Sequence, residues 1–140
     1  MTIAIDFDGT IVEHAYPEIG KPIPFAIETL KQLIKDGHQL ILWTVREGDL
    51  LNDAVNYCRE RGVEFYAINA DMPDNIADNL RSRKLSVDLF IDDRNLGGLP
   101  EWGIIYQMIK NEKVFEPFSG EIKREFTPQK KKGFFSKIFK

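Results

Sequence analysis

The stretch IAIDFDGT, residues 3–10, decides the predicted fold of this 140-residue chain. Its first three residues are apolar, and Asp6 and Asp8 then bring two carboxylates to the end of the run. Gly9 allows a sharp turn, and we expect the Thr10 hydroxyl to tie that turn with a hydrogen bond. A short apolar run of this kind is typical of a strand buried on both faces. The stretch therefore predicts a central strand that delivers carboxylates to one edge of a sheet.

Three further apolar runs resemble the first, and helical patterns lie between them. The predicted strands are residues 3–7, 39–44, 64–69 and 87–92, and the predicted helices are residues 24–35, 49–61, 73–83 and 100–111. Strands that alternate with helices are typical of a parallel sheet with helices on both faces. The sequence therefore predicts an α/β fold, a Rossmann-like three-layer sandwich around a central parallel sheet.

Length and composition fit one globular domain with a sizeable core. Hydrophobic residues make up 43% and charged residues 29% of the chain, as in ordinary soluble proteins. We expect no signal peptide and no membrane span, because a basic N-terminal region and a long apolar run are both missing from the sequence. With Cys58 as the one cysteine, an intrachain disulfide is excluded. We expect a buried packing role for Cys58 and a cytoplasmic protein.

The charges divide the chain into an acidic body and a basic tail. Residues 121–140 carry seven Lys or Arg and two Glu, a net charge of +5, whereas residues 1–120 carry a net charge of −8. The acidic body argues against non-specific binding to nucleic acid. Residues 130–140 mix lysines with phenylalanines and one isoleucine, a pattern that suits a membrane interface. We predict a folded domain over 1–120 and a tail that contacts the inner membrane surface or a partner, the alternative being a disordered solubilising tail.

Three of the four predicted strands end in residues that suit a phosphate site. Asp6 and Asp8 end the first strand, Thr44 ends the second, and Asp92 and Asp93 end the fourth. Ligands of parallel sheets bind beyond these carboxyl ends. Four carboxylates brought together repel one another, and a hard cation such as Mg²⁺ removes that conflict. The pattern predicts a Mg²⁺ site, and Mg²⁺ beside a carboxylate nucleophile suits phosphoryl transfer.

Four motifs in this order resemble those of the haloacid dehalogenase (HAD) superfamily of phosphohydrolases. They are DFDGT at 6–10, LILWT at 40–44, Lys84 within SRKLSVDLF, and FIDD at 90–93. Together they span most of residues 3–95. The resemblance implies a HAD-like catalytic domain over residues 1–120.

The resemblance also implies a mechanism of phosphomonoester hydrolysis through an aspartyl phosphate. Asp6 is then the nucleophile, and Asp8 protonates the leaving alcohol and afterwards deprotonates the attacking water. Mg²⁺ is bound by the Asp6 carboxylate, the Asp8 backbone carbonyl and Asp92, while Asp93 binds the metal or orients its water. Members that dehalogenate lack an aspartate at the position of Asp8, so phosphate ester hydrolysis is the implied reaction.

Phosphate contacts are assigned to a second set of residues. Thr44 and Lys84 hold the phosphoryl oxygens, with Arg81 or Arg83 as alternatives to Lys84. Further candidates for contacts with the phosphate or the substrate are Gly9, Thr10, Val45 and Arg46. Arg46 has the equally weighted alternative of a solvated loop residue. His14 is a candidate for a substrate contact, against the more common case of a loop histidine without a role.

The spacing of the motifs leaves no room for a cap domain. Thirty-six positions separate Asp8 from Thr44, and forty separate Thr44 from Lys84, which the predicted helices and strands fill. We therefore expect a capless member whose site is covered by the loop at 12–23, by the tail or by another subunit of a homo-oligomer. The expected substrate is a small phosphorylated metabolite or a phosphorylated macromolecular end.

Two other functions compete with the hydrolase. A phosphotransferase on the same fold passes the phosphoryl group to an alcohol instead of water. A receiver-like or non-catalytic phosphate-binding module also uses aspartates, a threonine and a lysine on an α/β sheet. A receiver, however, carries its acidic pair first and its phosphoacceptor at mid-chain, where this sequence has Asn69 at the end of the third predicted strand.

Overall fold

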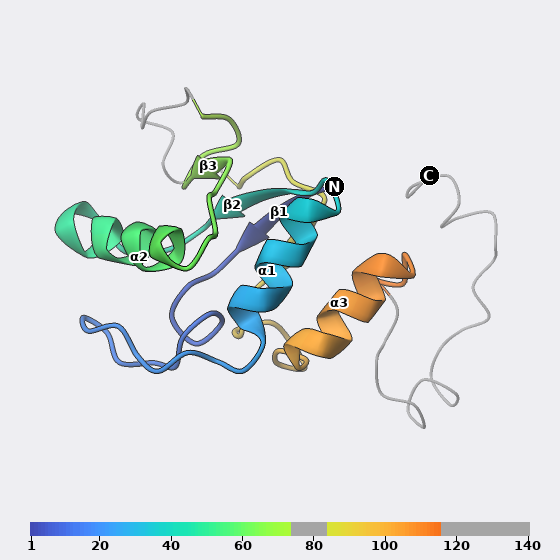
Figure 1. Cartoon of the computed structure of the whole chain (residues 1–140), viewed down its shortest axis with the longest axis horizontal. Coiled ribbons are helices and arrows are strands. Elements are labelled where there is room, and N and C mark those ends of the chain that lie inside the picture. The colour runs from blue at the N-terminus through green and yellow to red at the C-terminus, as the bar shows by residue number, and fades with distance from the viewer. Residues whose placement is uncertain (74–83, 116–140) are drawn as a thin grey trace.

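A four-stranded parallel sheet forms the centre of the fold (Figure 1). The computed structural model describes residues 1–73 and 84–115. Its elements, in chain order, are β1 (Thr2–Ile5), α1 (Ala26–Lys35), β2 (Gln39–Leu42), α2 (Gly48–Glu60), β3 (Ala67–Ile68), β4 (Leu89–Ile91) and α3 (Trp102–Lys110). The sheet order is β3-β2-β1-β4. The predicted α/β, Rossmann-like fold class is confirmed.

The first strand is central because its side chains are apolar on both sides. Ile3, Ala4 and Ile5 are all buried, and β1 is paired in parallel with β2 and with β4. In this register Ile5 lies opposite Leu42 on one side and Ile91 on the other. The residues that follow β1 and β4 therefore leave the sheet at the same edge.

β1 ends at Ile5, before the predicted end at Phe7, because the DFDGT turn forms its own backbone hydrogen bonds. The Phe7 carbonyl accepts hydrogen bonds from the amides of Thr10, Ile11 and Val12, at 3.1, 2.9 and 3.3 Å. A carbonyl engaged in this turn cannot continue the ladder to a neighbouring strand. The chain therefore turns directly after Asp6, whose amide still donates to Ile91 of β4 at 3.0 Å.

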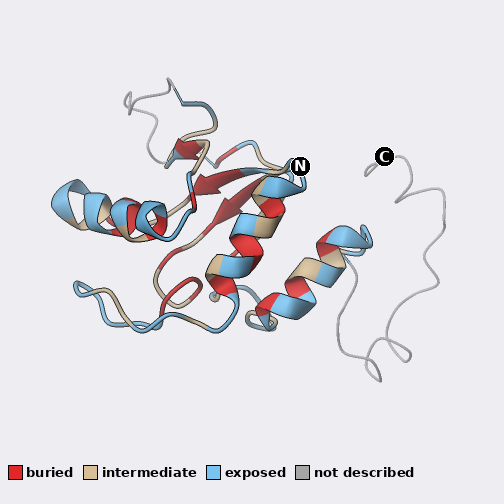
Figure 2. Ribbon diagram, in the orientation of Figure 1, coloured by how far each residue is buried: buried red, intermediate tan, exposed pale blue. Residues whose placement is uncertain are grey.

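The three described helices pack on one side of the sheet. The main core joins strand residues such as Ile3 and Leu40 to the inward sides of α1, α2 and α3, which Figure 2 shows as buried stripes. Chain progression from β1 to β2 to β3 runs in one direction across the sheet, so right-handed crossovers place α1 and α2 on the same side. Cys58 of α2 is buried in this core as predicted, and burial raises the pKa of its thiol to about 12.

The opposite side of the sheet carries a smaller core. Its buried residues are Ala4, Ile41, Ala67 and Leu85, and Leu85 belongs to the segment that leads into β4. The helix expected on this side is the predicted one at 73–83, so the prediction of helices on both sides stays a prediction. The predicted helix at 73–83 lies outside the described residues except for Pro73, and the predicted tail at 121–140 lies outside them entirely.

The site edge carries no inserted domain between β1 and β2. From Asp8 to Thr44 the chain forms only a loop, α1 and β2, as the capless prediction requires. Within the described ranges, none of the helices combines the length and the apolar character needed to cross a membrane.

Candidate functional site

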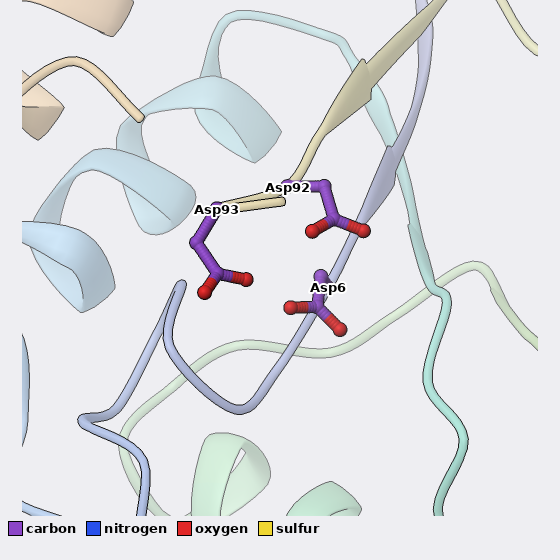
Figure 3. Close-up of side chains that lie close together, drawn as sticks. All are labelled: Asp6, Asp92 and Asp93. Atoms are coloured by element: carbon purple, nitrogen blue, oxygen red, sulfur yellow. The ribbon is translucent and has the colours of Figure 1, made fainter. Parts of the chain in front are cut away.

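Three aspartates converge at the carboxyl ends of β1 and β4. Each of Asp6, Asp92 and Asp93 offers one carboxylate oxygen, and these oxygens all lie within 4.8 Å of one another (Figure 3). The hydrogen bond between the Asp6 amide and the Ile91 carbonyl, at 3.0 Å, extends the pairing of β1 with β4 to the start of this cluster. We call these three residues the acidic triad.

The surroundings of the acidic triad favour the protonated form of Asp6. Burial and the charge of Asp92 raise the pKa of Asp6 to about 7, although hydrogen bonds from the Thr10 hydroxyl and the Phe7 amide lower it. Burial also acts to raise the pKa of Asp93, but hydrogen bonds with His14 and Asp6 outweigh it and bring that pKa below its ordinary value. A bound proton or a cation would relieve the conflict between the Asp6 and Asp92 charges.

Thr10 links the two strand ends through its buried hydroxyl. The side chain is 0% exposed. Its Oγ1 donates to Oδ2 of Asp6 at 3.0 Å and accepts from the Asp93 amide at 3.1 Å. The prediction that Thr10 ties the turn with a side-chain hydrogen bond is confirmed. Because a hydroxyl has one proton, and this one is used on Asp6, the predicted phosphate contact of the Thr10 side chain is not supported.

The turn at Gly9 accepts no larger residue without strain. Gly9 has φ +83°, and a Cβ at this position would collide with the His14 imidazole and the Asp93 carboxylate. Nε2 of His14 lies 2.7 Å from Oδ2 of Asp93. His14 thus contacts the acidic triad, a role that the sequence did not indicate and that the turn makes possible.

The Asp8 carboxylate pairs with Arg46 and not with the acidic triad. Its carboxylate accepts two hydrogen bonds from Arg46, from Nε to Oδ2 at 2.8 Å and from Nη2 to Oδ1 at 2.7 Å. The side chain of Asp8 is therefore not part of the acidic triad. The predicted metal contact of Asp8, which uses the backbone carbonyl, stays a prediction.

Arg46 is buried, so the alternative of a solvated loop residue is wrong. It is 0% exposed, and besides Asp8 it donates to the backbone carbonyls of Pro17, Glu18 and Leu50. Together these bonds use the N–H groups of Nε, Nη1 and Nη2, so the guanidinium has no N–H left to donate to a phosphate oxygen. In this structure Arg46 is a partner of Asp8 and not of a phosphate.

Thr44 keeps its hydroxyl proton among the described contacts, and its phosphate contact stays a prediction. Its amide donates to Oδ1 of Asn69 at 2.8 Å, and its Oγ1 accepts from the Arg46 amide at 3.2 Å. The hydroxyl proton of Thr44 is then available to another acceptor. Asn69, which follows β3 with φ +52°, fixes this loop through that bond. An asparagine after a strand is a weak sequence signal for such a role.

Of the remaining predicted phosphate contacts, Val45 and Lys84 are exposed, and the contact of Gly9 stays a prediction. Val45 is 87% exposed, and Lys84 is exposed with its Nζ 5.5 Å from the centroid of the Phe90 ring. Among the described residues Lys84 forms no salt bridge. Its alternatives Arg81 and Arg83 lie outside the described residues, so the choice of the cation stays a prediction.

The donor set of the acidic triad fits a hard divalent cation. All three candidate ligand atoms are carboxylate oxygens, which Mg²⁺ prefers. A cation would also offset the burial of Asp6 and the charge of Asp92, which together raise the pKa of Asp6. Asp6, Asp92 and Asp93 are therefore the residues that could hold Mg²⁺.

Comparison with known proteins supports the fold. No protein-family model and no curated protein matches the chain. A solved structure of a conserved protein from Bacteroides thetaiotaomicron is 60% identical and superposes with a TM-score of 0.76, covering 86% of this chain and 98% of that one. The chain belongs to the family of that conserved protein. The relationship to this conserved Bacteroides protein supports the α/β fold of the chain and says nothing about its activity.

Proposed function

We propose that this protein is a Mg²⁺-dependent phosphomonoester hydrolase of the HAD superfamily that acts through an aspartyl phosphate. The observation that carries the proposal is the acidic triad, which gathers Asp6, Asp92 and Asp93 at the carboxyl ends of β1 and β4. Asp6 opens the DFDGT motif and Asp92 and Asp93 close the FIDD motif. A receiver-like module places its phosphoacceptor at mid-chain, so this arrangement favours the hydrolase.

In this proposal Asp6 attacks the phosphorus of the substrate. The Thr10 hydroxyl holds Oδ2 of Asp6 at 3.0 Å, which restricts the rotation of the nucleophile. A nucleophile held in place needs less reorganisation to reach an in-line geometry. Mg²⁺ on the acidic triad would offset the charge of the phosphate oxygens, and the Thr44 hydroxyl and a cation such as Lys84 would hold those oxygens.

Asp8 transfers the protons. It follows Asp6 by two positions, and the Arg46 bonds hold its carboxylate apart from the acidic triad. In the first step a protonated Asp8 gives its proton to the leaving alcohol and becomes the carboxylate that pairs with Arg46. In the second step this carboxylate accepts a proton from the water that cleaves the aspartyl phosphate, which restores the protonated Asp8. The substrate class is a phosphate monoester, either a small metabolite or a macromolecular end.

The location we propose is cytoplasmic. Cys58 is buried, and as the one cysteine of the chain it has no intrachain partner. A free thiol in a small domain fits a reducing compartment.

The test is hydrolysis of p-nitrophenyl phosphate with and without Mg²⁺. Wild type should turn over only with Mg²⁺, and Asp6→Asn should lose this activity. Asp88→Asn is the matched control, because Asp88 precedes β4 at the opposite end of the strand and bonds the Thr2 amide. Activity retained in Asp6→Asn would refute the mechanism. Adding an alcohol acceptor and measuring the phosphorylated alcohol separates transfer from hydrolysis.

A further inference from the structure

Arg46 is the one charged residue that is buried within the described ranges. A buried guanidinium must find acceptors for its N–H groups, and besides the Leu50 carbonyl Arg46 finds them in two directions. Toward β1, its Nε and Nη2 bond both oxygens of Asp8, at 2.8 and 2.7 Å. Toward the loop after β1, its Nη1 and Nη2 bond the carbonyls of Pro17 and Glu18, at 3.1 and 2.9 Å.

Two aromatic rings further restrict the guanidinium. Its central carbon lies 5.1 Å from the ring centroid of Phe7 and 5.2 Å from that of Tyr16. Phe7 precedes Asp8 on the turn, and Tyr16 precedes Pro17 on the loop. The rings and the hydrogen bonds therefore join the same two segments, so Asp8 and residues 16–18 are held as one unit by a single side chain.

The base of the loop is closed without this arginine. Backbone hydrogen bonds from Glu13 to Lys21 at 2.8 Å and from Ile23 to Ile11 at 3.0 Å already close it. A buried ion pair is also weak grounds for a gain in stability, because desolvation offsets the attraction. The specific effect of Arg46 is to fix both oxygens of Asp8 in one plane, which a planar fork does and a lysine does not.

We propose that Arg46 is the positioning residue of Asp8, and that it sets the direction from which Asp8 reaches the leaving-group oxygen. This inference rests on the proposed function. Arg46 makes no bond to the acidic triad, so its loss should spare the nucleophile and the cation site. Its loss should instead weaken the step in which Asp8 moves a proton.

This role is tested by comparing kcat on two substrates of similar shape that differ in how much the leaving oxygen needs a proton. Phenyl phosphate needs a proton on its leaving oxygen, whereas p-nitrophenyl phosphate releases a stabilised anion and needs little help. General acid catalysis contributes about 10²- to 10⁴-fold. We expect Arg46→Met to lower kcat on phenyl phosphate by about 10²-fold or more, and to lower kcat on p-nitrophenyl phosphate by about tenfold or less. Arg59→Met, which removes an exposed arginine paired with Glu64, should change neither value.

Two further variants keep the test decisive. Arg46→Lys retains the charge but not the fork, so it should show the same change in selectivity even if Arg46→Met does not fold. In an Asp8→Asn background, Arg46→Met should have no further effect on the ratio of the two rates. Equal losses on both substrates, or no loss, would overturn the positioning role while leaving the proposed function intact. A wild type inactive on both substrates would overturn the proposed function and this inference with it.

Discussion

The Thr10 hydroxyl lies 3.0 Å from Oδ2 of Asp6, four residues earlier in the chain. Since the same hydroxyl accepts from the Asp93 amide, it connects the end of β1 to the end of β4. The candidate nucleophile and a candidate metal ligand are therefore aligned by one buried side chain. The Trp102 indole supports this position from α3 by donating to the Thr10 carbonyl at 2.9 Å.

Thr10→Val should destabilise the protein and reduce its activity. Valine keeps the shape but leaves the Asp93 amide without its acceptor, which costs about 1–3 kcal/mol. It also removes an interaction that lowers the pKa of Asp6, so that pKa should rise further. Urea unfolding and the Mg²⁺-dependent rate measure the two effects. Thr29→Val is the control, because Thr29 is a buried threonine of α1 away from the acidic triad; equal destabilisation of both variants would contradict the prediction.

Gly9→Ala should disturb the acidic triad as well as the backbone. A left-handed conformation costs a non-glycine residue about 1–2 kcal/mol. Gly37→Ala should show only this cost, because Gly37 has φ +94° and open space around its would-be Cβ. At Gly9 the Cβ also meets His14 and Asp93, so we expect a larger loss of unfolding free energy and weaker Mg²⁺ binding by calorimetry. Identical losses in the two variants would show that the close approach has no effect.

Without Mg²⁺ the protein should lose stability as the pH rises from about 4 to about 7. The pKa of Asp6 is raised from 3.8 to about 7, so in this window the folded state holds a proton that the unfolded state has released. Stability falls with pH wherever the folded state binds more protons. Thermal unfolding at a series of pH values measures the slope. Mg²⁺ should stabilise the protein most at the upper end of the window, and Asp6→Asn should flatten the slope; an unchanged slope in this variant would rule out Asp6 as its source.

The strand ends were predictable because alternation of apolar strands and helices fixes the edge at which polar residues gather. That rule placed Asp6, Asp92 and Asp93 together correctly. It could not say how Asp8 and Arg46 pair, because this contact depends on how the loop at 12–23 folds over the turn. Nor could it assign His14 to Asp93, since that contact requires the space left by Gly9. Local patterns thus predicted the positions along the strands, whereas the contacts between loops required the three-dimensional structure.

His14→Ala should weaken cation binding most at acidic pH. The hydrogen bond from His14 is the strongest of the interactions that bring the pKa of Asp93 below its ordinary value, so its removal should raise that pKa. A carboxylate with a higher pKa takes up its proton at a higher pH, and a protonated carboxylate binds Mg²⁺ less well. Binding of Mg²⁺ should therefore weaken further as the pH falls. The measurement is the Mg²⁺ dissociation constant at pH 5 and pH 8, with a larger increase expected at pH 5. His38→Ala is the matched control, because His38 bonds the amino terminus at 3.0 Å, at the start of β1. If both variants bind Mg²⁺ alike at both pH values, then His14 does not support Asp93 and the acidic triad holds its cation without it.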